Sequence, residues 1–333
     1  MKDRYVIGTL WLLAWLLAIA CSPVERELEQ EQVPVSFSAV VAGDMPATKA
    51  VNMADETGLK GTGFGVFACY TGLHPYAASN PTSNFMYNQK VRWDNAAPGR
   101  WVYEPVKYWP SGEGEATGTG TGETPQYVSF FAYAPYSDGT SECIPAFNLF
   151  QEQTNPWLLY CLAADVADQV DLLYAEPLLD QTKPSINSKL EFSFKHALAC
   201  VGDEVTITNS SSVTLSLKEV VIDYTLTEKA RLVLWNNGSA NWQPVQSGTI
   251  LTTRRVTLLS SGDPSLSLPH TFSGEGVFCI PVEATGYPQK ATIKITYIIS
   301  PGGVERTVTS ELALKNLLSE GKSTNIDIHL TNN

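Results

Sequence analysis

Histidine, serine and carboxylate side chains carry most enzyme chemistry, but this sequence shows no catalytic arrangement of them. The motifs HExxH, GxSxG, Walker A and GxGxxG have no match in a usable context. The histidines are scattered, and the one that alternates with two phenylalanines is expected to lie in a core or an interface. We therefore expect a protein that is not an enzyme. The histidines are His74, His196, His270 and His329.

Two groups of carboxylates deserve comparison with known acid and metal sites. Asp165, Asp168 and Asp171 are spaced by three, but they lack the glycine and the terminal glutamate of an EF-hand calcium loop. Glutamates of the glycine-rich stretch 112–123 are poorly placed for paired acid and base work. The sequence therefore predicts no metal site and no cofactor.

One cysteine near the start of the chain stands where lipid chemistry is expected. Residues 1–20 begin with Lys2 and Arg4 and continue as an apolar run that is too short for a comfortable membrane span. The stretch LAIAC, which ends at Cys21, resembles a bacterial lipobox. We predict export, attachment of diacylglycerol to the Cys21 sulfur and delivery to the outer membrane. A plain signal peptide is the alternative.

The stretch 33–50 combines an expected strand with an expected protease site. Its first part alternates apolar and polar residues, which is typical of a half-buried β-strand. A turn-rich segment then leads to Lys49 and Ala50, where a trypsin-like protease could cut. Removal of this strand would leave an apolar groove that another chain could fill by strand addition. An ordinary first strand is the alternative. The apolar positions are Val33, Val35, Phe37, Ala39 and Val41.

The other cysteines predict no metal site. No CxxC pair occurs, so zinc is not expected. A disulfide between Cys143 and Cys161 and a set of buried free thiols both stay open. The cysteines beyond Cys21 are Cys69, Cys143, Cys161, Cys200 and Cys279.

Composition points to a globular β protein. Of the 333 residues, 44% are hydrophobic and 17% are charged, which is too apolar for a disordered chain. The many Thr, Ser, Val and Tyr residues favour strands. The formal net charge is −12 and no Lys/Arg cluster opposes it, so we do not expect nucleic-acid binding.

Short apolar runs separated by turn residues continue to the end of the chain. Two adjacent strands are expected at Val213–Leu217 and Val220–Leu226, and a longer one at Ala291–Ser300. The chain ends on a strand with apolar residues two apart. We find no sustained helical periodicity, and the pattern indicates β-sandwiches. The apolar residues of the last strand are Ile326, Ile328 and Leu330.

A connector rich in Pro, Asn and Ser at 181–188 divides the expected strands into two groups. The predicted organisation is a signal peptide at 1–20, a tether with the removable strand at 21–49, an N-terminal β-sandwich at 50–187 and a C-terminal β-sandwich at 188–333.

Three blocks of sequence carry a family resemblance. They are MYNQ at 86–89 with WVYEPVKYWP at 101–110, VSFFAYAPY at 128–136, and FSFKHAL at 192–198. Together with the lipobox and with Gly-Lys-Ser at 321–323, they resemble the fimbrillin family of Bacteroidales, the subunits of type V pili.

The resemblance implies an all-β protein with two tandem transthyretin-like, Greek-key β-sandwich domains. It also implies a lipoprotein precursor from which a protease removes the first strand, so that a strand from a neighbouring subunit's C-terminus fills the groove. The removed strand would be Val33–Val41, and Ile326, Ile328 and Leu330 would lie on the donating or terminal strand. Because Lys49 stands where an arginine is usual, an uncut, lipid-retaining anchor or accessory subunit stays open.

The function predicted from these features is that of a structural or accessory pilus subunit serving adhesion at the cell surface. Its partners would be other pilin subunits, a processing protease, the outer membrane through the lipid, and a host or bacterial surface ligand. The alternative is a monomeric surface lipoprotein that binds glycans through exposed tryptophans. Trp93, Trp101 and Trp109 could form a stacking platform, but aromatic packing at the edges of a sandwich is the favoured interpretation of these three residues.

Overall fold

The computed structural model shows an all-β protein. Residues Pro34–Asn333 form one compact unit. No helix among the described residues is long and apolar enough to cross a membrane. Cys21, Lys49, Ala50 and the glycine-rich stretch 112–123 lie outside the described residues. The structure describes residues 32–42, 55–78, 81–110, 125–184, 188–245, 251–282 and 288–331.

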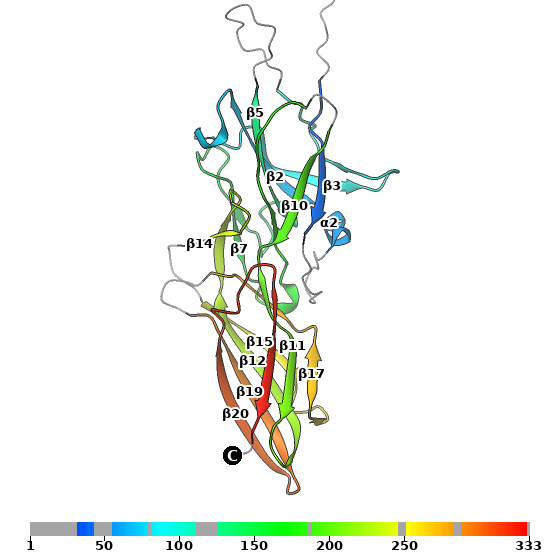
Figure 1. Ribbon diagram of the computed structural model, residues 1–333, viewed down its shortest axis with the longest axis vertical. Coiled ribbons are helices and arrows are strands. Elements are labelled where there is room, and N and C mark those ends of the chain that lie inside the picture. Colours follow the sequence, from blue (N-terminus) through cyan, green and yellow to red (C-terminus); the bar gives the residue numbers. More distant parts are fainter. Residues whose placement is uncertain are drawn as a thin grey trace, which may run out of the picture. The chain divides into compact units, whose positions relative to one another are not determined.

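The largest sheet has eight strands and begins at an edge strand from the start of the chain. Figure 1 shows this strand, β1, beside β10. Buried aromatic residues of β2, β5 and β10 line the sheet. Its order is β1 (Phe37–Val41), β10 (Leu190–His196), β8 (Leu173–Ala175), β5 (Tyr127–Ala134), β2 (Phe64–Gly72), β3 (Met86–Asp94) and β4 (Arg100–Val102), with β9 (Leu178–Gln181) paired to β5.

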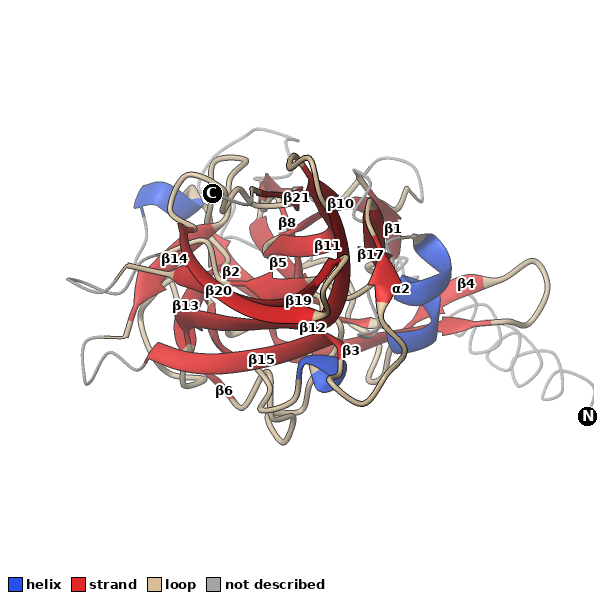
Figure 2. Ribbon diagram, turned by 90° about the horizontal axis from the view of Figure 1, so that it is seen from below, coloured by secondary structure: helices blue, strands red, loops and turns tan. Residues whose placement is uncertain are grey.

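Two further sheets pack face to face as a β-sandwich, with side chains of both in one continuous core (Figure 2). The first sheet contains β17 (His270–Ser273), β11 (Ala199–Asn209) and β18 (Val277–Cys279), with β21 (Ser323–Leu330) paired to β11. The second contains β15 (Leu251–Leu259), β12 (Thr214–Thr227), β19 (Lys290–Ser300) and β20 (Val304–Ala313), with β16 (Leu266–Ser267) paired to β12.

A fourth sheet packs against the eight-stranded sheet. The ring of Phe147 lies 5.8 Å from Phe67 and 5.5 Å from Tyr133, which belong to the eight-stranded sheet. This contact closes the core between the two sheets. The order of the fourth sheet is β14 (Asn241–Pro244), β13 (Lys229–Val233), β7 (Trp157–Cys161) and β6 (Ala146–Phe147).

Helical structure is short. The helix α2 (Glu56–Thr62) begins where the Asp55 side chain accepts hydrogen bonds from the N–H groups of Thr57 and Gly58, and it buries Leu59. It stops at Gly63, whose φ of 71° favours glycine. A helix of 7 residues is too short to show a sustained apolar period, so the sequence pattern missed it. The 3-10 turns are η1 (Tyr76–Ala78) and η2 (Val166–Asp168).

Two strands that the sequence predicts separately form one continuous strand in the structure. The predicted pair Val213–Leu217 and Val220–Leu226 forms the single strand β12, because a bulge near Lys218 absorbs the change of register instead of a turn. The expected strand Ala291–Ser300 is confirmed as β19, with Ile293, Ile295 and Tyr297 buried.

Strand pairing crosses the connector at 181–188. β10 follows the connector but joins the eight-stranded sheet, between β1 and β8. In the other direction, β7 precedes the connector but pairs with β13. The division into domains at residues 187 and 188 stays a prediction.

Candidate functional site

The edge strand β1 is attached along one side. It runs parallel to β10, with Phe37 opposite Leu190 (Figure 1). The Leu190 N–H donates to the Ser36 carbonyl at 2.8 Å, and the Ala42 N–H donates to the Phe194 carbonyl at 2.7 Å. Among the described strands, β10 is the only one paired with β1. The other edge of β1 is therefore free of a ladder.

The apolar face of β1 fills an aromatic pocket. Val35, Phe37 and Ala39 are buried, as their alternation predicts, whereas Val41 is half-buried. Phe37 is 2% exposed and lies at the centre of the pocket. Its ring neighbours are Phe64, Tyr103, Phe130 and Phe192, with ring centroids between 5.5 and 6.4 Å away.

The strand is shorter than the sequence predicts, because it begins at Phe37 instead of Val33. Val35 turns away from β10 and donates its N–H to the Lys107 carbonyl at 2.9 Å. The Tyr103 hydroxyl donates to the Val35 carbonyl at 2.8 Å. These bonds fix the entry to β1 against a segment that the sequence pattern did not connect with it.

The residues expected to be processed follow β1 directly in the sequence. Lys49 and Ala50 lie in the segment between β1 and α2, outside the described residues, as does Cys21. A cut in that segment would leave β1 without a covalent link to α2 and the strands that follow.

A second edge strand, β21, lies near the end of the chain. It runs parallel to β11, with Ile326 opposite Val205 and Leu330 opposite Asn209. Ile326 and Leu330 are buried and Ile328 is half-buried, so the predicted apolar face is confirmed. β11 is its only partner among the described strands.

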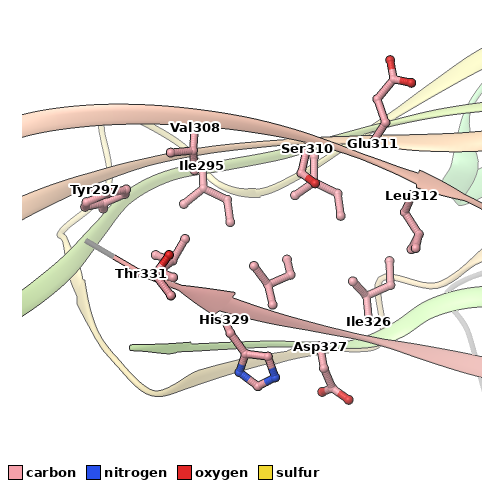
Figure 3. A pocket seen from close by; sticks show the side chains of 13 residues that line it. Ile295, Tyr297, Val308, Ser310, Glu311, Leu312, Ile326, Asp327, His329 and Thr331 are labelled. Carbon is pink, nitrogen blue, oxygen red and sulfur yellow. The ribbon is translucent and has the colours of Figure 1, made fainter. Parts of the chain in front are cut away.

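A groove of about 400 Å³ separates β21 from β20, the edge strand of the facing sheet. Figure 3 shows Ile295, Val308 and Leu312 directed toward the side of Ile326, whereas His329 points away from the groove. The floor and walls are thus mainly apolar. β20 was not predicted, because its outer residues are polar and exposed and give little alternation.

The two edge strands share an unusual geometry. Of the strand pairs in the described residues, only β1 with β10 and β21 with β11 are parallel. Both edge strands carry apolar residues two apart, and β10 and β11 are consecutive in the chain. A strand of the β21 type could therefore pair with β10 in the direction that β1 uses.

The aspartates compared with a calcium loop make structural hydrogen bonds instead. The carboxylate Oδ2 of Asp171 lies 2.7 Å from Nδ1 of His196, and both residues are buried in the core. Burial raises the pKa of Asp171, and the hydrogen bond to His196 opposes that rise. Asp165 instead accepts from the Ala167 N–H at the start of η2. The described residues contain no group of three potential metal ligands.

The three tryptophans pack against aromatic neighbours, as the favoured interpretation of the sequence expects, and do not form a platform. Trp109 is 6% exposed and packs against Phe130, so it presents no face to a ligand. Trp93 and Trp101 lie opposite each other on β3 and β4, with ring centroids 5.2 Å apart, and contact each other edge to face. The three tryptophans are equally spaced in the sequence, but they do not share a surface, because Trp109 packs against Phe130 of β5.

The cysteines of the described residues are free thiols. The Cys161 N–H donates to the Cys143 carbonyl at 2.9 Å, so the two backbones are adjacent without a disulfide. Burial raises the pKa of Cys69 and of Cys200 to about 12 in each case. These thiols are core residues.

Comparison with known proteins identifies the family of the chain. A family model described as fimbrillin-like matches residues 48–333. The chain belongs to the fimbrillin-like family. The match leaves out β1 and everything before it.

A curated relative is the fimbrium subunit Fim1C of Phocaeicola vulgatus. It is 26% identical over 174 residues, which cover 47% of this fimbrillin-like chain and 40% of that protein. The chain thus spans less than half the length of this relative.

Two similar solved structures have low identity to this chain and TM-scores below 0.5. A candidate cell adhesion protein from Bacteroides uniformis has 17% identity and a TM-score of 0.38, with 83% of each chain covered. One from Bacteroides eggerthii has 9% identity and a TM-score of 0.45, with 91% of this chain and 87% of that chain covered.

Proposed function

We propose that this protein is a structural or accessory subunit of a type V pilus and that subunits join by exchange of edge strands. The observation that carries the proposal is the attachment of β1. Its apolar face completes a core, yet β10 is its only partner among the strands that the structure describes. Family membership and the name of the curated relative agree with a place in a fimbria.

The site that β1 occupies is suited to accept a strand. Loss of β1 would expose the pocket around Phe192 and leave the backbone groups of one edge of β10 without partners. Each large apolar side chain that refills the pocket contributes about 1.5–3 kcal/mol before ordering costs. An added strand would therefore bind tightly and dissociate slowly.

The C-terminal strand is suited to be the donor. β21 is already parallel to its neighbour, and its buried residues Ile326 and Leu330 lie on one face of the strand with the half-buried Ile328 between them. In a polymer, β21 of one subunit would lie on β10 of the next, with its apolar face in the aromatic pocket.

Export and processing complete the proposal. The chain is made as a lipoprotein precursor carrying lipid on Cys21, reaches the outer membrane and is cut after Lys49 to release β1. The two halves act as transthyretin-like sandwich domains. The protein serves assembly and adhesion instead of catalysis.

The experiment is limited trypsin digestion of the purified full-length precursor, followed by N-terminal sequencing and electrophoresis in SDS without heating. We expect a new terminus at Ala50 and a ladder of oligomers. Lys49→Gln is expected to block both, while Lys60→Gln, a matched change in α2, leaves them intact.

A start at Ala50 without oligomers would contradict strand exchange. A lipid-blocked Cys21 on protein recovered from cells would contradict processing and indicate an anchor subunit that keeps its first strand.

A further inference from the structure

One tryptophan among the described residues stands apart from the others. Trp235 is 42% exposed, and its ring has no hydrogen-bond, aromatic or cation–π partner in the structure. Each of the others has one. Trp93 contacts Lys60, Trp101 contacts Phe64, Trp109 contacts Phe130, Trp157 contacts Arg231 and Trp242 donates to the Ala197 carbonyl. A singly exposed ring is ordinary on a protein surface, so what singles out Trp235 is that its open ring also lines a cavity.

The loop that carries Trp235 is fixed by hydrogen bonds to neighbouring segments of the chain. It connects β13 to β14, and Asn236 donates to the Ala175 carbonyl at 3.2 Å. Lys195 donates to the Gly238 carbonyl at 3.0 Å, and the Ala240 N–H donates to the Glu320 carboxylate at 2.6 Å. Both of these charged side chains are therefore engaged with the loop backbone. A loop fixed in this way loses little entropy when it binds.

The side chains on the outer side of this loop are not all engaged in hydrogen bonds. A cavity of about 450 Å³ is lined by Trp235, Asn236, Asn237, Ser239, Ala240 and Asn241, none of which carries a charge. The side chains of Asn237 and Ser239 make no hydrogen bond in the structure, and both residues are exposed. The cavity thus combines an aromatic face with uncommitted amide and hydroxyl groups.

We propose that this loop binds a neutral sugar unit of a surface glycan. The C–H face of a pyranose ring has a slight positive charge and fits the negative face of an indole. Sugar hydroxyls both donate and accept, as do the Asn237 amide and the Ser239 hydroxyl. The absence of charged lining residues disfavours acidic sugars, whose carboxylates would lose water without gaining a cation.

The site lies on the β13–β14 hairpin and is lined by no residue of β1 or β21, so it can be tested separately from strand exchange. It also differs from the platform considered for the sequence, which named other tryptophans.

The test uses the full-length, uncut protein in detergent, with maltohexaose, cellohexaose, mannohexaose and xylohexaose as probes. Binding is followed by tryptophan fluorescence and by titration calorimetry. We expect at least one probe to bind and Trp235→Ala to weaken its binding by about tenfold or more. Asn237→Ala and Ser239→Ala are expected to weaken it by about threefold each. Phe150→Ala removes an exposed aromatic ring from another hairpin and should leave binding unchanged.

Circular dichroism of each variant checks that the fold is retained. The proposal is overturned if no probe binds at millimolar concentration, or if Trp235→Ala binds as well as the unaltered protein. Binding of hexagalacturonate in preference to every neutral probe would also overturn it. Failure of these tests leaves the trypsin ladder unaffected, so the two proposals are judged separately.

Discussion

Phe37 stacks on Phe192, with ring centroids 5.6 Å apart and planes inclined by 26°. The first ring belongs to β1 and the second to β10, which lies far along the chain and in register with β1. The pair joins the segment proposed to leave with the strand that would receive its replacement. Its strength bears on how readily β1 departs.

We expect Phe37→Ala to lower the free energy of unfolding of the intact chain by about 3–5 kcal/mol, since it empties a packed aromatic site. After trypsin cleavage, the same change should speed the loss of β1. Chemical denaturation measures the first effect, and size-exclusion chromatography at timed intervals measures the second. Val40→Ala, on the opposite face of the strand, should have a much smaller effect. Equal effects of the two substitutions would contradict the assigned facing.

The faces of the strands could be predicted from sequence because side chains alternate along an extended chain. Val35, Phe37 and Ala39 all point inward, as do Ile326 and Leu330. Alternation fixes which side is buried without any knowledge of neighbours. The family resemblance likewise needed only the local blocks.

Partners could not be predicted in the same way. Nothing around Phe37 indicates that it meets Phe192, and nothing around Asp171 indicates that it meets His196. Pairing depends on chain topology over long separations, which a local pattern does not contain. The groove beside β20 was missed for a related reason, since that strand contributes Val308 and Leu312 among polar neighbours.

Two adjacent arginines should differ in their effect on stability. Arg254 donates from Nε to the Ala163 carbonyl at 2.5 Å and from Nη2 to the Leu162 carbonyl at 3.0 Å. Arg254→Lys would keep the charge but could not serve both carbonyls, so we expect a loss of about 1–3 kcal/mol. Arg255, whose side chain is 68% exposed, pairs with Asp223 at the surface.

Arg255→Lys is therefore the control and should cost less than about 1 kcal/mol. Thermal unfolding of the two variants beside the unaltered protein is the measurement. A larger loss for Arg255→Lys than for Arg254→Lys would show that the bonds to Leu162 and Ala163 are not structural.

The thiols should react in an order set by burial. Cys161 is half-buried, whereas Cys69, Cys200 and Cys279 are fully buried. Burial raises the pKa of all of them, and it raises the pKa of Cys279 well above the ordinary range. With few thiolates present at about pH 8, we expect slow labelling by Ellman's reagent, led by Cys161.

Cys161→Ser should remove the fastest phase of labelling, and guanidinium should expose the remaining thiols together. Rapid labelling of Cys69 or Cys200 in the folded protein would instead indicate that the core opens locally.

Asp171 gives a pH dependence of known sign. Burial raises its pKa above the ordinary value of 3.8, so the folded state holds the proton more tightly than the unfolded state does. The resulting stabilisation is fully present below the unfolded pKa and is lost as pH rises through the folded pKa. Asp171→Asn keeps the shape and cannot titrate. The free energy of unfolding of the unaltered protein should therefore fall relative to Asp171→Asn as pH rises from about 3, by no more than about 1.4 kcal/mol per pH unit.

Asp223 provides the control of opposite sign. Its hydrogen bond from Arg255 lowers its pKa below 3.8, so its stabilisation is present above the unfolded pKa and is lost as pH falls through the folded pKa. Relative to Asp223→Asn, the unaltered protein should therefore gain stability as pH rises through the same acid range. Urea denaturation at a series of pH values, applied to both variants, separates the two trends. If stability relative to both Asn variants changed with pH in the same direction, Asp171 would not be held in its buried contact with His196 in solution. Only burial of that carboxyl gives its pKa shift a sign opposite to that of Asp223 in a surface ion pair.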